Sequence, residues 1–136
     1  MRAAAHNAGF ASEDDLQIAA MVRLARLPAP AWVADAWSHT LNPKATVADL
    51  VYHTPNGGGR SKREAGRFKA MGVQRGVPDL ITAVPVPPYV GAALELKQPG
   101  NYPTPNQRAE LQYRHQLGHA VGWADDLEAI VTFWRR

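Results

Sequence analysis

The sequence contains no cysteine, and this absence excludes disulfide bonds and thiolate metal sites. No apolar run approaches the roughly 20 residues that a membrane-spanning helix needs. The first residues, MRAAAHNAGFAS, lack the long apolar core of a secretory signal peptide. We therefore expect a cytoplasmic protein in which any bound metal is held by oxygen or imidazole ligands.

The length of the chain and the order of its apolar segments predict a single α/β domain with a small mixed β-sheet. The 136 residues fit one compact domain, which we expect over 12–136 after a flexible segment at 1–11. Residues 31–49 predict irregular structure with room for a short helical turn. Capping residues, proline and glycine set the other boundaries. The predicted helices are 13–27, 61–71, 105–117 and one capped by Asp125, and the predicted strands are 50–54, 80–84, 89–97 and 119–123.

The segment Ala-Leu-Glu-Leu-Lys at 93–97 places two charged side chains inside an apolar run. Alternate residues of a strand share one face. Glu95 and Lys97 are therefore expected to point the same way and to lie together at the surface. Leu94 and Leu96 are expected to point into the core.

The preceding strand supplies a second carboxylate. A hairpin centred on Pro87 pairs Asp79 with Glu95, in the register 85 with 89, 83 with 91 and 81 with 93. Directly opposed residues have Cβ atoms roughly 4.5–5.5 Å apart, so two carboxylates placed there repel each other. A divalent cation compensates that repulsion, because hard cations take oxygen ligands from one or two carboxylates. Lys97 beside them is suited to binding a phosphate oxygen or orienting a water.

A second interpretation makes the same residues ordinary. On a solvent-facing edge hairpin, Asp79, Glu95 and Lys97 form surface ion pairs without a chemical role. The register separates the two interpretations, because a slip by one residue sends the two carboxylates to opposite faces of the sheet.

Basic side chains gather in the segment from Arg60 to Arg75, against the one acid Glu64. Such a cluster is typical of a phosphate-binding surface. The alternative is an ordinary solvated helix face. The basic residues of this segment are Arg60, Lys62, Arg63, Arg67, Lys69 and Arg75.

Several of these motifs together resemble the VRR-NUC domain of the PD-(D/E)xK nuclease superfamily. The residues that carry the resemblance are GVPDL at 76–80, ELK at 95–97 and Gln107. Glu13 and Gln17 are similar to the acid and glutamine of the family's first helix, and 53–58 is similar to its Asn-Gly loop. The resemblance covers most of the chain, from about Glu13 to Trp134. It implies a restriction-endonuclease-like core.

The resemblance also implies metal-dependent hydrolysis of DNA phosphodiesters. Asp79, Glu95 and the Leu96 carbonyl would bind Mg²⁺ or Mn²⁺, and Glu13 would face the same metal from the first helix. Lys97 would position the attacking water and stabilise the charge that develops on the phosphate.

Two of the implied site residues have a structural alternative. Glu13 stands where any helix favours an acid, and Asp14 and Asp15 compete for its role. Gln107 follows Thr104 by three residues, which is also the spacing of a capping box. The family resemblance places Gln107 near the active site.

The loop and the remaining ring-bearing residues give weaker indications. Asn56 and Gly57 let the backbone approach DNA, but a plain turn explains them equally well. Among the histidines only His53, beside this loop, is a candidate for phosphate contact. The tryptophans are read as core residues rather than base-stacking platforms: Trp32, Trp37, Trp123 and Trp134.

The resulting expectation is a Mg²⁺-dependent DNA endonuclease that cuts four-way or other branched DNA as a homodimer. A compact single domain of this type would suit a bacterium or a phage-infected cell. The alternatives are a flap, nicking or restriction-type nuclease, a nuclease acting on RNA, and a DNA-binding module that does not cut.

Overall fold

The computed structural model describes residues 12–30, 45–54, 62–72 and 76–135. The predicted order of elements is confirmed, with the short helix α3 at the end of the segment 31–49 and reaching Leu50, the first residue of the predicted strand 50–54. The first three strands are shorter than expected, and the last is shifted by one residue along the chain. The elements are α1 (Glu13–Leu24), α3 (Val47–Leu50), β1 (Tyr52–His53), α4 (Lys62–Ala70), β2 (Leu80–Thr82), β3 (Ala92–Leu96), α5 (Pro105–Gln116), β4 (Ala120–Ala124) and α6 (Leu127–Trp134).

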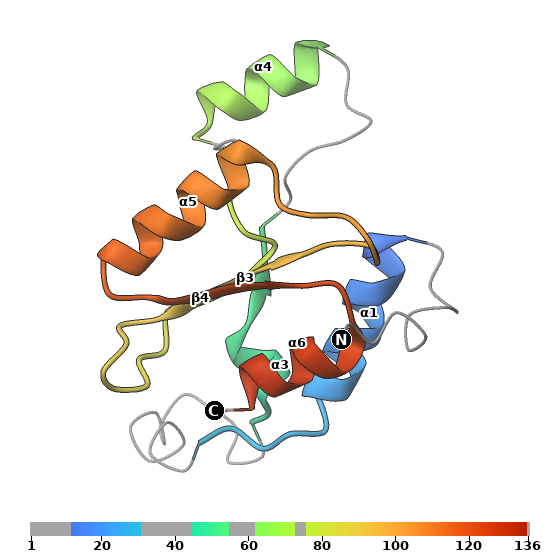
Figure 1. Cartoon of the computed structure of the whole chain (residues 1–136), viewed down its shortest axis with the longest axis vertical. Helices are drawn as coiled ribbons and strands as arrows, with labels where there is room; N and C mark the ends of the chain where they lie inside the picture. Colours follow the sequence, from blue (N-terminus) through green and yellow to red (C-terminus); the bar gives the residue numbers. More distant parts are fainter. Residues whose placement is uncertain (1–11, 31–44, 55–61, 73–75, 136) are drawn as a thin grey trace.

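The described strands form one mixed sheet in the order β1-β2-β3-β4. β1 pairs with β2 and β2 with β3 in antiparallel fashion, whereas β3 and β4 are parallel. Helix α5 lies on one side of the sheet, and α1, α3 and α6 lie on the other (Figure 1). The predicted α/β class with a small mixed sheet is therefore confirmed.

The hydrophobic core lies between the sheet and the helices α1 and α6. Leu94 and Leu96 of β3 point into it, as the alternation predicted, and both are only 1% exposed. Leu16, Ala20 and Leu24 form the buried stripe of α1, because residues four apart lie on the same face of a helix. This packing fixes β3, and so leaves the odd-numbered residues of that strand facing α5.

Local sequence signals explain where α1 begins and ends. The Ser12 hydroxyl accepts a hydrogen bond from the Asp15 amide at 3.1 Å, and three acids follow in the first turn. The helix ends at Leu24 rather than at residue 27, and the chain turns before Pro28. In the part of the chain that the structure describes, no helix is long and apolar enough to cross a membrane.

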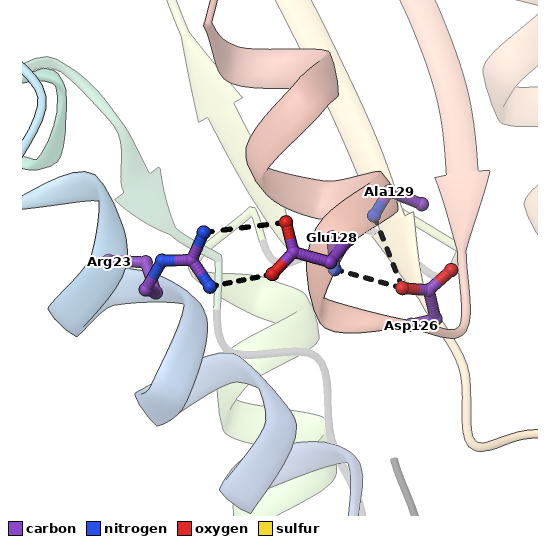
Figure 2. A network of polar contacts seen from close by, with 4 residues as sticks. All are labelled: Arg23, Asp126, Glu128 and Ala129. Carbon is purple, nitrogen blue, oxygen red and sulfur yellow. Dashed lines mark hydrogen bonds and ion pairs between the residues drawn. The ribbon is translucent and has the colours of Figure 1, made fainter. Parts of the chain in front are cut away.

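Helix α6 is capped by Asp126, not by Asp125 as predicted. Asp126 Oδ1 accepts from the amides of Glu128 and Ala129 at 2.9 and 3.3 Å (Figure 2). Asp125 is buried instead, at 5% exposed. The strand runs one residue further than expected, which moves the start of the helix along the chain. Arg23 of α1 reaches Glu128 at 2.7 Å, and this exposed ion pair joins the two helices.

The hairpin between β2 and β3 has the predicted register along its strands. The observed pairs are Leu80 with Leu94, Ile81 with Ala93 and Thr82 with Ala92. At the tip the prediction is wrong: Val86 pairs with Tyr89, where the count required residue 85. Three residues, 83–85, therefore face two, 90–91, and this bulge absorbs the mismatch. The strand register, and with it the placement of Asp79, is unaffected.

Candidate active site

Four polar or aromatic residues form a row across the sheet. Continuing the observed registers by one residue places Thr54 opposite Asp79, and Asp79 opposite Glu95. The parallel pairing then places Trp123 beside Glu95. Register partners share one face of a sheet, so the row Thr54, Asp79, Glu95, Trp123 lies on the face that α5 covers.

Backbone groups hold Asp79 in this row. The Leu96 amide donates a hydrogen bond to Asp79 Oδ2 at 2.8 Å. The Asp79 carbonyl accepts from the Thr54 amide at 3.0 Å and lies 3.0 Å from His53 Nδ1. His53, which the sequence made a candidate for phosphate contact, is therefore next to the site, and its contact in this structure is to a backbone oxygen. These contacts hold Asp79 opposite Glu95, where the hairpin count predicted it.

Glu95 is buried, whereas the sequence predicted it at the surface. It is 2% exposed, because α5 packs over the face of the sheet that was expected to meet water. Lys97 is also largely covered, with 12% of its side chain exposed, and its Nζ lies 3.8 Å from Glu95 Oε1. The two residues do share a face, but that face is an interior one, so the interpretation as an ordinary solvent-facing hairpin fails.

Gln107 forms the capping box and also contacts Glu95, so the structural role is confirmed and the functional role stays a prediction. Its Oε1 accepts from the Thr104 amide at 2.8 Å, and its own amide donates to Thr104 Oγ1 at 3.2 Å. These two bonds complete the capping box of α5. The same side chain donates from Nε2 to Glu95 Oε1 at 2.7 Å. One side chain therefore starts the helix and orients a buried carboxylate.

Burial raises the pKa of both carboxyl groups. Burial is the main cause for Glu95, whose pKa rises to about 8, and the nearby charge of Asp79 adds to it. The pKa of Asp79 is raised by burial, and the hydrogen bond from Leu96 opposes that rise. Glu95 Oε2 is buried and has no hydrogen-bond partner among the described residues. The pair is therefore built to hold a proton or a cation.

Glu13, at the first position of α1, lies close to the same group. It is partly buried, whereas Asp14 and Asp15 are exposed, so of the three acids the structure favours Glu13. Burial raises the pKa of Glu13, the charge of Lys97 lowers it, and that of Asp79 raises it again. Electrostatic interaction with both site residues places its carboxyl group near them.

A complete set of metal ligands is not preformed. In the described segments, no three His, Asp or Glu side chains are close enough together to hold a metal ion. The metal-binding roles of Glu13 and of the Leu96 carbonyl remain predictions. What the structure does bring together is Asp79, Glu95, Lys97 and Gln107, which the sequence selected.

The predicted DNA-contacting residues divide into two groups. Helix α4 has no buried residue and stands away from the sheet, beyond α5 (Figure 1). It carries the exposed basic residues Lys62, Arg63, Arg67 and Lys69. The other predicted contacts lie outside the described residues: Asn56, Gly57, Arg60 and Arg75.

The sequence analysis did not identify two aromatic residues beside the site. The sequence predicts Trp123 as a core residue, but it is only half-buried and its ring meets that of Tyr102 edge-on, with centroids 5.4 Å apart. Only the parallel register of β4 reveals its place next to Glu95, and no local motif encodes that register. Trp134 is a core residue, as predicted, at 6% exposed, whereas Trp32 and Trp37 lie outside the described part of the chain.

Comparison with known proteins supports the predicted resemblance at the level of the fold. No family model and no curated protein matches the sequence. Among solved structures, a protein described as a VRR_NUC domain protein superposes with a TM-score of 0.68 at 24% identity. The match covers 89% of this chain and 83% of the other. This chain therefore has the fold of a VRR_NUC domain protein.

Proposed function

We propose that this protein is a Mg²⁺-dependent endonuclease that hydrolyses phosphodiester bonds in branched DNA as a homodimer. The observation that carries the proposal is the pairing of the partly buried Asp79 with the buried Glu95 on one face of the sheet, with Lys97 beside them. A protein that only bound DNA would need positive charge at its surface, and would not need two neighbouring carboxylates that are shielded from water. Mn²⁺ is the alternative cation.

The donor set fits a hard divalent cation. Asp79 and Glu95 supply carboxylate oxygens, and Glu95 Oε2 is a buried oxygen with no hydrogen-bond partner among the described residues. Asp79, Glu95 and the Leu96 carbonyl would hold the ion, with Glu13 facing it from α1. When bound, such an ion lowers the pKa of a coordinated water and neutralises charge on the phosphate.

The chain's own residues prepare the site for this chemistry. The amide of Leu96 and the side chain of Gln107 each occupy one oxygen of a carboxylate, and so fix how Asp79 and Glu95 face the substrate. Lys97 holds a positive charge 3.8 Å from Glu95. Its amino group would orient the attacking water and stabilise the negative charge that develops on the phosphate oxygens.

The likeness in fold and the basic helix α4 support DNA as the substrate. The exposed lysines and arginines of α4 provide charge for the phosphate backbone outside the site. A homodimer would carry two such sites, related by the commonest symmetry of soluble oligomers, and would cut two strands of a four-way junction.

A cleavage assay on a synthetic four-way junction tests the proposal. We expect the wild type to cut in Mg²⁺ and to be inactive in EDTA. Lys97→Ala should lower the rate by about 100-fold or more, the usual loss when one stabilising group is removed. Arg26→Ala, which removes an exposed positive charge on another surface, is the matched control.

Equal cleavage by the wild type and Lys97→Ala would refute the role given to Lys97. Binding without cleavage of any branched, linear or RNA substrate would favour the non-cutting DNA-binding module. Preferential cutting of flaps or linear duplex would keep the chemistry but replace the junction substrate.

A further inference from the structure

The row of residues that carries the carboxylates ends in an aromatic pair. Trp123 of β4 is the register partner of Glu95 and points to the same face of the sheet. Tyr102, in the loop between β3 and α5, packs its ring against that indole with an angle of 62° between the planes. The pair therefore stands beside the site, at the edge strand.

Tyr102 is presented to solvent by an ordered loop. Its exposed fraction is 63%, which is high for a large aromatic residue. The loop turns where the Asn101 amide donates to the Gln98 carbonyl at 3.0 Å, and Pro103, the residue after Tyr102, is buried. An exposed side chain whose backbone is held by such a turn loses little conformational entropy when a ligand stacks on its ring.

The Tyr102 ring is separated from the carboxylates by about the length of a few nucleotides of a DNA strand. Neighbouring strands lie about 4.8 Å apart, and the Tyr102 ring is one ring contact from Trp123, the neighbour of Glu95. The aromatic face is thus on the order of 10 Å from Glu95, or about three stacked nucleotides along one strand.

We propose that Tyr102 and Trp123 form a platform for an unpaired nucleobase within about three nucleotides of the phosphodiester that is cut. The inference rests on the proposed nuclease function and specifies its substrate, because a fully paired four-way junction offers such a base only where pairs open at the crossover. Inside a duplex both faces of a base are covered by its neighbours, so only an unstacked base can lie on an aromatic ring. The platform selects DNA with unpaired nucleotides next to the cut over fully paired DNA.

The test compares two DNAs that differ only in pairing near the cut. One is a fork with a 2-aminopurine in its unpaired arm, and the other is the fully paired duplex with the same label. Binding in EDTA is followed by 2-aminopurine fluorescence, and single-turnover cleavage in Mg²⁺ gives the fork-to-duplex ratio of rates. The variants are Tyr102→Phe, which keeps a ring, and Tyr102→Leu, which keeps only apolar bulk. Tyr113→Ala, at an exposed tyrosine of α5, is the matched control.

The wild type, Tyr102→Phe and Tyr113→Ala should quench the fluorescence of the fork and cut the fork preferentially. Tyr102→Leu should lose the quenching and about 5- to 100-fold of the preference, as expected for one base–aromatic stack. If Tyr102→Leu matches Tyr102→Phe in both measurements, the platform is wrong even though cleavage continues. If the wild type quenches the fluorescence of the fork but cuts no DNA, the platform is supported and the proposed nuclease function is wrong.

Discussion

The charge of Glu95 should make the stability of the cation-free protein fall as the pH rises. Its pKa is raised in the folded state from the ordinary value of 4.5 to about 8, mainly by burial. Below the ordinary pKa, folded and unfolded chains both hold the proton. Between the two values the unfolded chain releases it, whereas the folded chain still holds it. The stabilisation is therefore complete at low pH and is lost as the pH rises through the folded pKa.

The magnitude is large compared with the stability of a small domain. Where the folded state holds one proton more than the unfolded state, the free energy of unfolding falls by about 1.4 kcal/mol per pH unit. Across the whole range of the shift the loss is on the order of 5 kcal/mol, against a total of about 5–15 kcal/mol for a typical domain. The raised pKa of Asp79 acts in the same direction.

A bound cation should oppose this loss, because it takes the place of the proton. A cation at a concentration of about 100 times its dissociation constant stabilises the folded state by about 2.7 kcal/mol. We expect Mg²⁺ or Mn²⁺ to stabilise the protein strongly near about pH 8.5 and weakly near about pH 5.5, where the proton competes.

Urea denaturation in EDTA, followed by tryptophan fluorescence from about pH 5.5 to about pH 8.5, measures the slope. Glu95→Gln imitates the protonated acid: its carbonyl can accept from Gln107 and its amide can donate to Asp79. The free energy of unfolding of this variant should depend less on pH, and should exceed that of the wild type at the alkaline end. Glu128→Gln alters an exposed carboxylate and should keep the wild-type slope. A wild-type stability that is constant or rises over this range, or the same slope in both variants, would refute the reasoning.

Three further outcomes follow from contacts described above. Gln107→Ala should lower the stability by about 1–3 kcal/mol and also lower the cleavage rate, because Glu95 loses the hydrogen bond that Gln107 donates. Thr104→Ala breaks the same capping box and should lower only the stability, by about 1 kcal/mol. Replacing the basic residues of α4 by glutamine should reduce the slope of log K against log salt by up to about 3–4, as measured by fluorescence anisotropy, whereas Arg26→Ala should leave it nearly unchanged. In urea denaturation, Gly91→Ala should lower the stability of the protein by about 1–3 kcal/mol, because the added Cβ would lie 2.8 Å from the Thr82 carbonyl oxygen. Gly66→Ala in α4 should raise it by about 0.5–1 kcal/mol, since no atom lies within 4 Å of the added Cβ.

The features that the sequence predicted correctly depend on local rules. Caps, prolines and glycines mark most helix ends, such as Ser12 before α1 and Gly118, with φ +97°, after α5. The alternation in 93–97 and the hairpin count then place Asp79 opposite Glu95, since both require only neighbouring strands. The central part of the site could therefore be predicted from residues close in the chain.

The errors and omissions depend on packing between distant segments. Glu95 looked exposed because nothing in 93–97 shows that α5 will cover that face. Trp123 looked like a core residue because the parallel pairing of β4 with β3 joins residues 28 positions apart. Asp126 rather than Asp125 caps α6 because a strand boundary moved by one residue, and such boundaries depend on tertiary contacts.

The position of Gln107 has a consequence for the motions of the protein. The amide that closes the first turn of α5 also holds Glu95, so unwinding of that turn releases the carboxylate. Any ligand that binds only the ordered carboxylate must then make that unwinding less favourable, because the two equilibria are linked. Amide hydrogen exchange in the first turn of α5 would thus report on occupancy of the carboxylate pair, without any DNA being cut.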